Sequence, residues 1–281
     1  MTRRYLTDDE YRDYFFSLGN VRNIIAKDLI EIAGDKAERI LDVASGHGLF
    51  ALEVSRAFPK AHVCATGLEM DKRTFVETRW ALKTKGLRTL PHLSDRCLRN
   101  LCYTVTDVTR LPFKDDSFDA TVNLLGLEDV RMTRGEQGMR QTIWEASRVT
   151  KPGGIVQLAI QTFSDSPEDI LAREIMEDIG HGGIFLGPAI YEAVMDQANL
   201  RLKARKKYTT ERVLTAPQAR EELQYTCMDT SKVYGRYGVK TRTFGEIWDK
   251  FGKRIEMHGY ALYTDILAMF AVKRPPPEKA S

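Results

Sequence analysis

The chain has 281 residues, of which 43% are hydrophobic and 29% are charged, and its formal net charge is +3. This composition supplies enough apolar material for a core and excludes a largely disordered chain, whereas the small net charge neither requires nor excludes a polyanionic partner. No run approaches the ~20 apolar residues that span a bilayer, and acids interrupt an N-terminus that lacks the apolar stretch of a signal peptide.

The cysteines are few and irregularly spaced, at positions 64, 97, 102 and 227. Cys97 and Cys102 have no second Cys/His pair at the spacing of a zinc site, so we expect no metal site. Together with the missing signal peptide, this usage predicts a reducing, cytoplasmic setting.

Apolar residues at helical spacing predict helical structure across residues 8–33. Gly19-Asn20 interrupts this pattern, so we predict two helices ahead of the first strand. From residue 39 to residue 163, short apolar runs alternate with helical stretches, which is typical of βαβ units and a parallel sheet. The expected strands are 40–44, 62–66, 102–105, 118–122 and 154–160, and the expected helices are 49–58, 72–85 and 137–149, with a short further helix in 86–100.

Beyond residue 163 this alternation breaks. Ser166, Pro167 and the two acids after them predict the capped start of a helix over 164–180. The remaining expected elements are helices at 188–199, 217–227 and 244–259 and antiparallel strands at 203–215 and 265–273. The two last helices form an insertion over one end of the sheet, because about 50 residues are too many for an unstructured loop in a compact domain.

We therefore predict an α/β protein with a Rossmann-like, mostly parallel seven-stranded sheet and helices on both faces. N-terminal helices precede the sheet, and a helical insertion separates its last two strands. The expected parts are an N-terminal helical lid (1–33), a ligand-binding core (34–163) and a C-terminal part (164–281) that completes the sheet and carries a helical substrate cap at 216–264.

A loop with two glycines, Gly46 and Gly48, joins the first expected strand to a helix, and Asp42 stands at the end of that strand. The glycines let the backbone turn sharply and approach a ligand, although an ordinary strand-to-helix turn shows the same pair. A pyrophosphate would be repelled by Asp42, whereas the cationic, phosphate-free S-adenosylmethionine would not. Asp42 therefore argues against a nicotinamide cofactor.

Two further acids end the second and third expected strands. Glu69 follows the glycines by about 20 residues, where a carboxylate can accept both hydrogen bonds of a ribose diol; it could also simply stabilise a helix start. Asp107 can accept from an adenine amino group. Because the carboxyl ends of parallel strands share one edge of the sheet, we expect Asp42, Glu69 and Asp107 on a common rim.

In this combination the sequence resembles the class I S-adenosylmethionine-dependent methyltransferases over residues 33–163. The resemblance is carried by Asp42-x-x-x-Gly46-x-Gly48, Gly67-Leu68-Glu69, Asp107 with Leu111-Pro112-Phe113, Asp116-Ser117-Phe118-Asp119 and Arg148-Val149-Thr150-Lys151-Pro152-Gly153-Gly154. Within that class it is most similar to the small-molecule branch that includes ubiquinone/menaquinone-biosynthesis C-methyltransferases. The segment after the fourth expected strand, Leu125-Gly126-Leu127-Glu128-Asp129-Val130, also resembles that branch.

The resemblance implies S-adenosyl-L-methionine as cofactor. It places Asp42, Gly46 and Gly48 around the methionine part, Glu69 at the ribose, and Asp107 and Val108 at the adenine. Further candidate cofactor contacts are Ala44, His47, Met70 and Leu124. His47 departs from the family pattern, where Thr or Ser is common, so it touches the cofactor or merely faces solvent.

A general base is needed only if the acceptor loses a proton as it is methylated. The candidate catalytic residues are Glu128 and Asp129 after the fourth strand, and His181 and His258 in the segments expected to overhang the site. The two carboxylates could instead only cap the following helix. Tyr11 and Tyr14 on the N-terminal lid, with His181, are candidate substrate contacts; a core-facing helix stripe gives the two tyrosines the same spacing.

The expected function is methyl transfer to a small-molecule or lipid-like acceptor by a monomer or homodimer. The alternative is an RNA or protein methyltransferase that uses the basic stretch at 201–207, a stretch that an exposed edge strand would also explain. A nicotinamide oxidoreductase and a cofactor-binding scaffold without turnover are the remaining hypotheses.

Overall fold

The computed structural model describes residues 8–69, 72–73, 75–76, 95–181, 185–209, 213–261 and 264–275, with only the backbone given for 8–17 and a few other helical positions. The candidate contact Met70 and the side chains of Tyr11 and Tyr14 lie outside the described residues.

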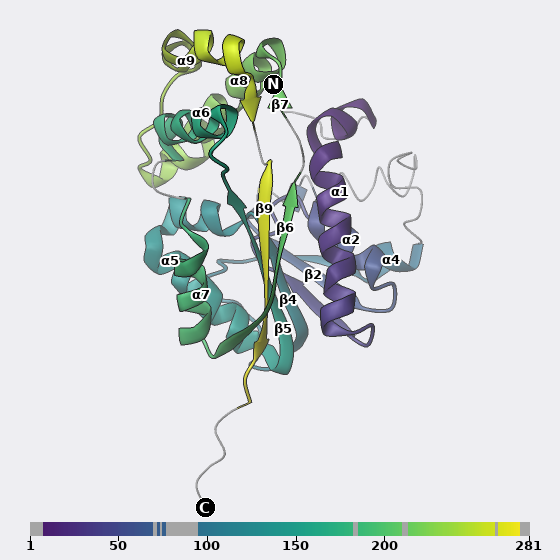
Figure 1. Cartoon of the computed structure of the whole chain (residues 1–281). Coiled ribbons are helices and arrows are strands. Elements are labelled where there is room, and N and C mark those ends of the chain that lie inside the picture. Colours follow the sequence, from purple (N-terminus) through teal and green to yellow (C-terminus); the bar gives the residue numbers. More distant parts are fainter. Residues whose placement is uncertain are drawn as a thin grey trace, which may run out of the picture.

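A seven-stranded sheet forms the centre of the molecule (Figure 1). Its strands are β1 (Arg39–Asp42), β2 (His62–Gly67), β3 (Leu101–Val105), β4 (Phe118–Leu124), β5 (Thr150–Thr162), β6 (Leu200–Thr209) and β9 (Asp265–Lys273). Their order is β3-β2-β1-β4-β5-β9-β6. The first five strands are parallel, and β9 is antiparallel to both β5 and β6. The predicted Rossmann-like class is confirmed.

Helices cover both faces of this sheet (Figure 1). The helices α1 (Asp8–Ala33), α2 (Leu49–Ala57) and α4 (Asp95–Arg99) lie on one face and share a core with β1, β2 and β9, whereas α5 (Leu127–Val149) and α7 (Pro188–Gln197) cover the other face. The central strands carry apolar side chains on both faces of the sheet, because helices cover both faces.

The prediction of two helices before the first strand is wrong, because α1 runs without a break through Gly19-Asn20. A glycine inside a helix costs about 1 kcal/mol relative to alanine. Burial of Leu18, Val21 and Ile25 against α2 and the sheet outweighs that cost.

A second apolar cluster unites the helices at the carboxyl ends of the parallel strands, at the top of Figure 1. It contains α6 (Pro167–Met176), α8 (Ala216–Val233), α9 (Phe244–His258), and the two-stranded sheet of β7 (Val213–Leu214) and β8 (Tyr260–Ala261). We call these elements the cap. As the sequence predicts, the Ser166 side chain caps α6 by accepting from the Asp169 backbone N–H at 3.2 Å, with Pro167 in the first turn.

The expected strand at 203–215 is also corrected, since β6 ends at Thr209 and Val213–Leu214 pairs in the separate cap sheet. β9 starts opposite Thr209, so the main sheet offers no further partner to the chain beyond that residue. No helix among the described residues is long and apolar enough to cross a membrane, and the described residues contain no cluster of metal-ligating side chains.

Candidate functional site

The loop between β1 and α2 lies where the strand order reverses, because β1 pairs with β2 on one side and with β4 on the other. Open α/β sheets bind ligands in the crevice at such a switch point. Ala44, Gly46 and Gly48 adopt left-handed backbone conformations, with φ of 52°, 51° and 76°. The loop therefore turns tightly and leaves main chain facing the crevice.

Neighbouring residues fix the shape of this loop. A Cβ atom on Gly48 would stand 2.4 Å from Phe75 Cδ2, and one on Gly126 would stand 2.3 Å from the Ala44 carbonyl oxygen. The Tyr103 hydroxyl donates to the Gly46 carbonyl at 2.9 Å, and Asn123 Nδ2 donates to the Val43 carbonyl at 2.7 Å. Sequence reasoning missed Tyr103 and Asn123.

Asp42 is fully buried at the end of β1. Its Oδ2 accepts from the Ser45 hydroxyl at 2.7 Å, whereas its Oδ1 has no hydrogen-bond partner among the described residues. Burial raises the pKa of Asp42 to about 7, against the hydrogen bonds from Ser45 and the Ala51 backbone. A buried carboxylate oxygen without a donor is costly, so this atom marks a place for a cationic or hydrogen-bonding ligand group.

His47 lies half-buried in the same loop beside α1. Burial lowers the pKa of His47 to about 4, and the nearby charge of Arg22 on α1 lowers it further. The imidazole is therefore neutral at physiological pH, and it adds no positive charge next to the site.

The other two predicted acids follow β2 and β3. Glu69 stands two residues beyond β2 and is exposed. Asp107 stands two residues beyond β3 and accepts from the Thr109 backbone N–H at 2.9 Å and from the Thr109 hydroxyl at 2.7 Å. Because β2 and β3 are parallel and their last residues, Gly67 and Val105, are register partners, Glu69 and Asp107 lie on the same edge as Asp42.

Asp107 also accepts from Nη2 of Arg134 on α5, at 3.1 Å. Partial burial opposes ionisation of Asp107, but the hydrogen bonds from Thr109 and the charge of Arg134 outweigh it and lower the pKa of Asp107. Val108 next to it is buried in the cluster under the loop, while Leu124 is half-buried at the end of β4.

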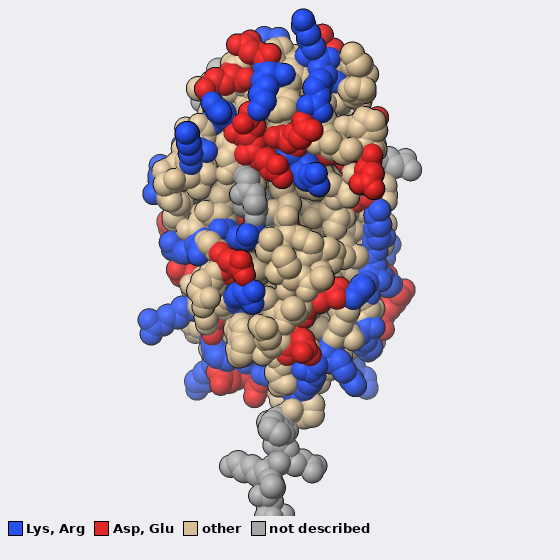
Figure 2. All heavy atoms as spheres, turned by 60° about the vertical axis from the view of Figure 1, so that its left-hand side comes forward, with Lys and Arg blue, Asp and Glu red and all other residues tan. Residues whose placement is uncertain are grey.

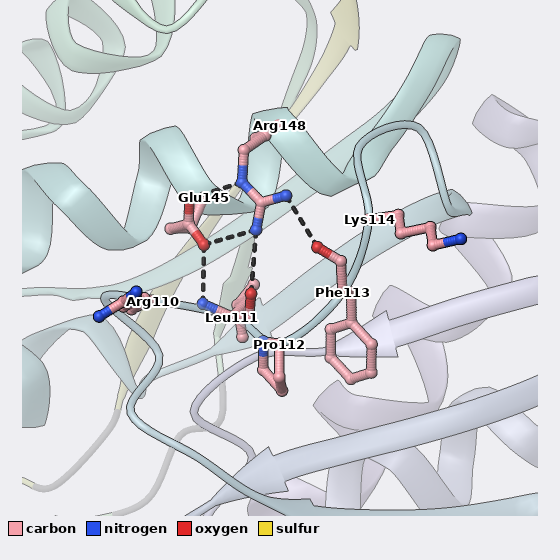
Figure 3. A pocket seen from close by; sticks show the side chains of 7 residues that line it. All are labelled: Arg110, Leu111, Pro112, Phe113, Lys114, Glu145 and Arg148. Carbon is pink, nitrogen blue, oxygen red and sulfur yellow. Dashed lines mark hydrogen bonds and ion pairs between the residues drawn. The ribbon is translucent and has the colours of Figure 1, made fainter.

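The loop that follows Asp107 is clamped to α5 by Glu145 and Arg148 (Figure 3). Glu145 Oε2 accepts from the Leu111 backbone N–H at 2.7 Å, and the Arg148 guanidinium donates to the Leu111 and Phe113 carbonyls at 3.0 and 2.8 Å. The two side chains also pair with each other. They line a surface pocket with Arg110, Pro112 and Lys114, and the bonds drawn in Figure 3 indicate that they hold the loop in place.

Glu128 lies in the first turn of α5, directly after β4, and is buried. Its Oε1 accepts from the Gln161 backbone N–H at 3.0 Å, and its Oε2 has no hydrogen-bond partner among the described residues. Burial raises the pKa of Glu128 to about 7, against that backbone hydrogen bond. Asp129 beside it is exposed.

Of the two candidate histidines, His181 ends the short helix η1 (Glu177–His181) that follows α6, and His258 belongs to the cap. His181 is buried, with Nε2 at 3.0 Å from the Thr230 hydroxyl and its ring edge-on to Tyr234. Burial lowers the pKa of His181 to about 4, so the ring is neutral. His258 ends α9 and is exposed. The structure thus gathers the acids on one rim, and it places His258 in the cap and His181 in the short helix after α6.

These residues fit S-adenosylmethionine. The buried Asp42 Oδ1 can face a positively charged group, and the left-handed loop exposes main chain. Asp107 offers an ionised carboxylate at the end of β3, on the same edge of the sheet. S-adenosylmethionine carries no phosphate, so its binding requires no phosphate-binding group.

The sheet order and the acids at the ends of β1, β2 and β3 are those expected of a class I S-adenosylmethionine-dependent methyltransferase domain. Residues 41–158 match the family model described as a methyltransferase domain. This match supports the class, the enzyme type and the cofactor predicted from the sequence.

Similar curated proteins include a demethylmenaquinone methyltransferase of Streptomyces avermitilis, 32% identical over 120 residues (43% of this chain and 41% of that protein). A ubiquinone/menaquinone biosynthesis C-methyltransferase of Syntrophotalea carbinolica is 29% identical over 173 residues (59% of this chain and 63% of that protein). The chain thus spans about half the length of these relatives.

Two solved structures show the same fold. The YcgJ protein of Bacillus subtilis superposes with a TM-score of 0.59 at 17% identity, over 92% of this chain and 100% of that one. The [4+2]-cyclase SpnF superposes with a TM-score of 0.57 at 16% identity, over 90% of this chain and 81% of that one. Because a chain titled as a cyclase shares it, the fold alone does not fix the reaction.

Proposed function

We propose that the protein transfers the methyl group of S-adenosylmethionine to a small molecule that carries an ionisable hydroxyl group. The observation that carries this proposal is Glu128, a buried carboxyl group with a pKa of about 7 and one oxygen without a partner among the described residues. It follows β4, next to the loop around Gly46, and Gly126 just before it packs on Ala44.

S-adenosylmethionine supplies an electrophilic methyl group, so the reaction forms a bond from the acceptor to the methyl carbon as the sulfur–methyl bond breaks. Catalysis then depends on holding the two partners in line and away from water. A phenol, enol or hydroquinone becomes a better nucleophile when it loses its proton, and we infer that Glu128 accepts that proton through Oε2. A carboxyl group with a pKa near 7 is suited to this exchange at neutral pH.

Two further polar side chains near Glu128 support an oxygen-bearing acceptor. Tyr191 on α7 is fully buried and its hydroxyl has no hydrogen-bond partner among the described residues; the same is true of Nε and Nη1 of Arg131 on α5. Burial raises the pKa of Tyr191, the charge of Glu128 raises it further and that of Arg131 lowers it, so the three groups lie within electrostatic range of one another. Their polar atoms without hydrogen-bond partners among the described residues favour a ligand with several oxygen atoms, as in the quinone precursors that the relatives' names indicate.

The alternative of a nucleic-acid or protein substrate rests on the basic stretch at 201–207, which lies on the edge strand β6. Three of its cations pair within the chain: Arg205 with Glu192, Lys206 with Asp28, and Lys207 with Asp265. On the face shown in Figure 2, Lys and Arg are interspersed with Asp and Glu around a wide uncharged area. These pairings favour the small-molecule acceptor.

The decisive experiment has two steps. Calorimetry should detect binding of S-adenosylhomocysteine, and Asp107→Asn should weaken it about tenfold or more because a charged acceptor is lost. Glu136→Gln, which alters an exposed ion pair on α5, is the matched control. Absence of binding to the wild-type chain would remove the proposal.

The second step offers radiolabelled S-adenosylmethionine with a short-chain demethylmenaquinol, a catechol, transfer RNA or a basic protein. We expect label only on a hydroxylated small molecule, and label on RNA or protein would favour the alternative. A lipid-like acceptor, a monomer or homodimer, the three-part domain division and a cytoplasmic location stay predictions from the sequence.

A further inference from the structure

Two cysteines face each other across the β2–β3 pair. Cys64 on β2 and Cys102 on β3 are register partners in a parallel ladder, so their side chains point to the same face of the sheet. Neighbouring strands lie about 4.8 Å apart, and Cys64 Sγ stands 3.3 Å from the hydroxyl of Thr104, which lies two residues beyond Cys102 on β3. The distance between such Cα atoms falls within the range of about 4.4–6.8 Å that disulfides span.

The two thiols differ in access to solvent. β3 is an edge strand of the sheet, and Cys102 on it is exposed, whereas Cys64 is buried beneath the loop after Asp107. The neighbouring Cys102 thiol and burial raise the pKa of Cys64. A thiolate is the reactive form, so Cys64 resists oxidation by reagents in solution unless a neighbour brings it an activated sulfur.

The remaining cysteines lack this arrangement. Cys97 on α4 and Cys227 on α8 are both buried, and Cys227 belongs to the apolar cluster of the cap. They provide internal controls, because they are thiols of the same chain without a cysteine as strand register partner.

We propose that Cys64 and Cys102 are a redox pair that closes reversibly to an intramolecular disulfide on exposure to hydrogen peroxide. The Cys102 thiolate attacks one peroxide oxygen, so an S–O bond forms, the O–O bond breaks and, after protonation, water leaves. The Cys64 sulfur then attacks the Cys102 sulfenic acid, so the S–S bond forms, the S–O bond breaks and a second water leaves. In total two thiols and one peroxide give one disulfide and two waters.

The pairing also explains why such a bond would be reversible. Neighbouring strands lie about 4.8 Å apart, whereas the Cβ atoms of a disulfide prefer a separation of about 3.8 Å. Closing the bond draws β2 and β3 together, and a strained disulfide is readily reduced by a dithiol. This inference does not depend on the proposed methyltransferase activity.

The test uses the reduced full-length chain, which has four thiols, treated with a few equivalents of hydrogen peroxide. We expect the thiol count to fall by two and peptide mapping to show residues 64 and 102 linked, with a mass lower by two hydrogens. Dithiothreitol should restore all thiols. The Cys97→Ser and Cys227→Ser variants should behave like the wild type, and Cys102→Ser should keep its remaining thiols.

The Cys64→Ser variant should instead accumulate sulfenic or sulfinic acid at Cys102, because the resolving thiol is gone. A wild-type chain that also stops at sulfinic acid on Cys102, or that links a different pair, overturns the proposal. If Cys64→Ser does not fold, the Cys102→Ser variant still tests the proposal, since the exposed position 102 tolerates the change. Loss of two thiols from Cys102→Ser under the same treatment would contradict the proposed pair.

Discussion

Arg134 donates through Nη2 to Oδ2 of Asp107 over 3.1 Å, which joins the middle of α5 to the rim at the end of β3. The same guanidinium lies 5.5 Å from the ring centre of Tyr237, in the short helix η2 (Tyr234–Tyr237) that follows α8 of the cap. Arg134 therefore connects the carboxylate expected to hold the adenine with the helices that overhang the site.

We expect Arg134→Gln to bind S-adenosylhomocysteine up to about fivefold more tightly, because the guanidinium and the adenine amino group compete for the same oxygen. The limit follows from the pair's exposure, since exposed ion pairs contribute about 0.2–1 kcal/mol. Calorimetry at low salt measures the effect. The difference in affinity between the wild type and Arg134→Gln should shrink as the salt concentration rises. Arg140→Gln, on the same helix and paired with Glu136, is the control; equal affinities in the two variants would contradict the competition.

Binding of S-adenosylmethionine should weaken as the pH falls from 8 to 6. Asp42 has a pKa of about 7 in the ligand-free chain, so it is mostly ionised above that pH and mostly protonated below it. A cationic ligand favours the ionised form. Titration of affinity against pH measures this, and Asp42→Asn should bind weakly with a flat profile. A wild-type profile without slope in this range would exclude Asp42 as the titrating group.

The same variant should be more stable than the wild type at pH 8. The folded pKa of Asp42 lies above the ordinary value of 3.8, so the stability that comes from its neutral form is present below about pH 4 and is lost as the pH rises through 7. Asp42→Asn removes the buried charge and should raise the unfolding temperature by several degrees at pH 8, but hardly at pH 5. Scanning calorimetry at both pH values decides, and an equal shift at both would show that the charge is not the cause.

Gly48→Ala should destabilise the fold more than Gly46→Ala. Both glycines have positive φ, which costs an alanine about 1–2 kcal/mol. A Cβ at position 48 would also meet Phe75 Cδ2 at 2.4 Å, whereas one at position 46 has nothing within 4 Å. We expect an additional loss of about 1–3 kcal/mol for Gly48→Ala in urea unfolding. Similar losses in both variants would mean that Phe75 moves aside without cost.

Glu145→Gln should loosen the loop after Asp107. The substitution replaces the carboxylate that accepts from the Leu111 amide and pairs with Arg148, so we expect a loss of about 1–3 kcal/mol and faster hydrogen exchange at Leu111. Mass-spectrometric exchange on peptides that cover 107–116 measures it. Glu136→Gln should leave those peptides unchanged.

The sequence by itself determined the order of elements. Apolar runs separated by helical stretches predicted the parallel sheet, and the strand at 265–273 matches β9 residue for residue. The acids at the strand ends could be placed on one rim because parallel strands share their carboxyl edge. These features depend on residues that are near one another in the chain, so their periodicity is visible without a structure.

Only the tertiary structure decided which side chains complete the site. Tyr103 reaches Gly46 across 57 residues, Asn123 reaches Val43 across 80, and Arg134 reaches Asp107 across 27. The continuity of α1 through Gly19 likewise came from burial against α2, which outweighed local propensity. Contacts of this kind arise when separate elements pack, and their free energies belong to the packed fold rather than to any local stretch of sequence.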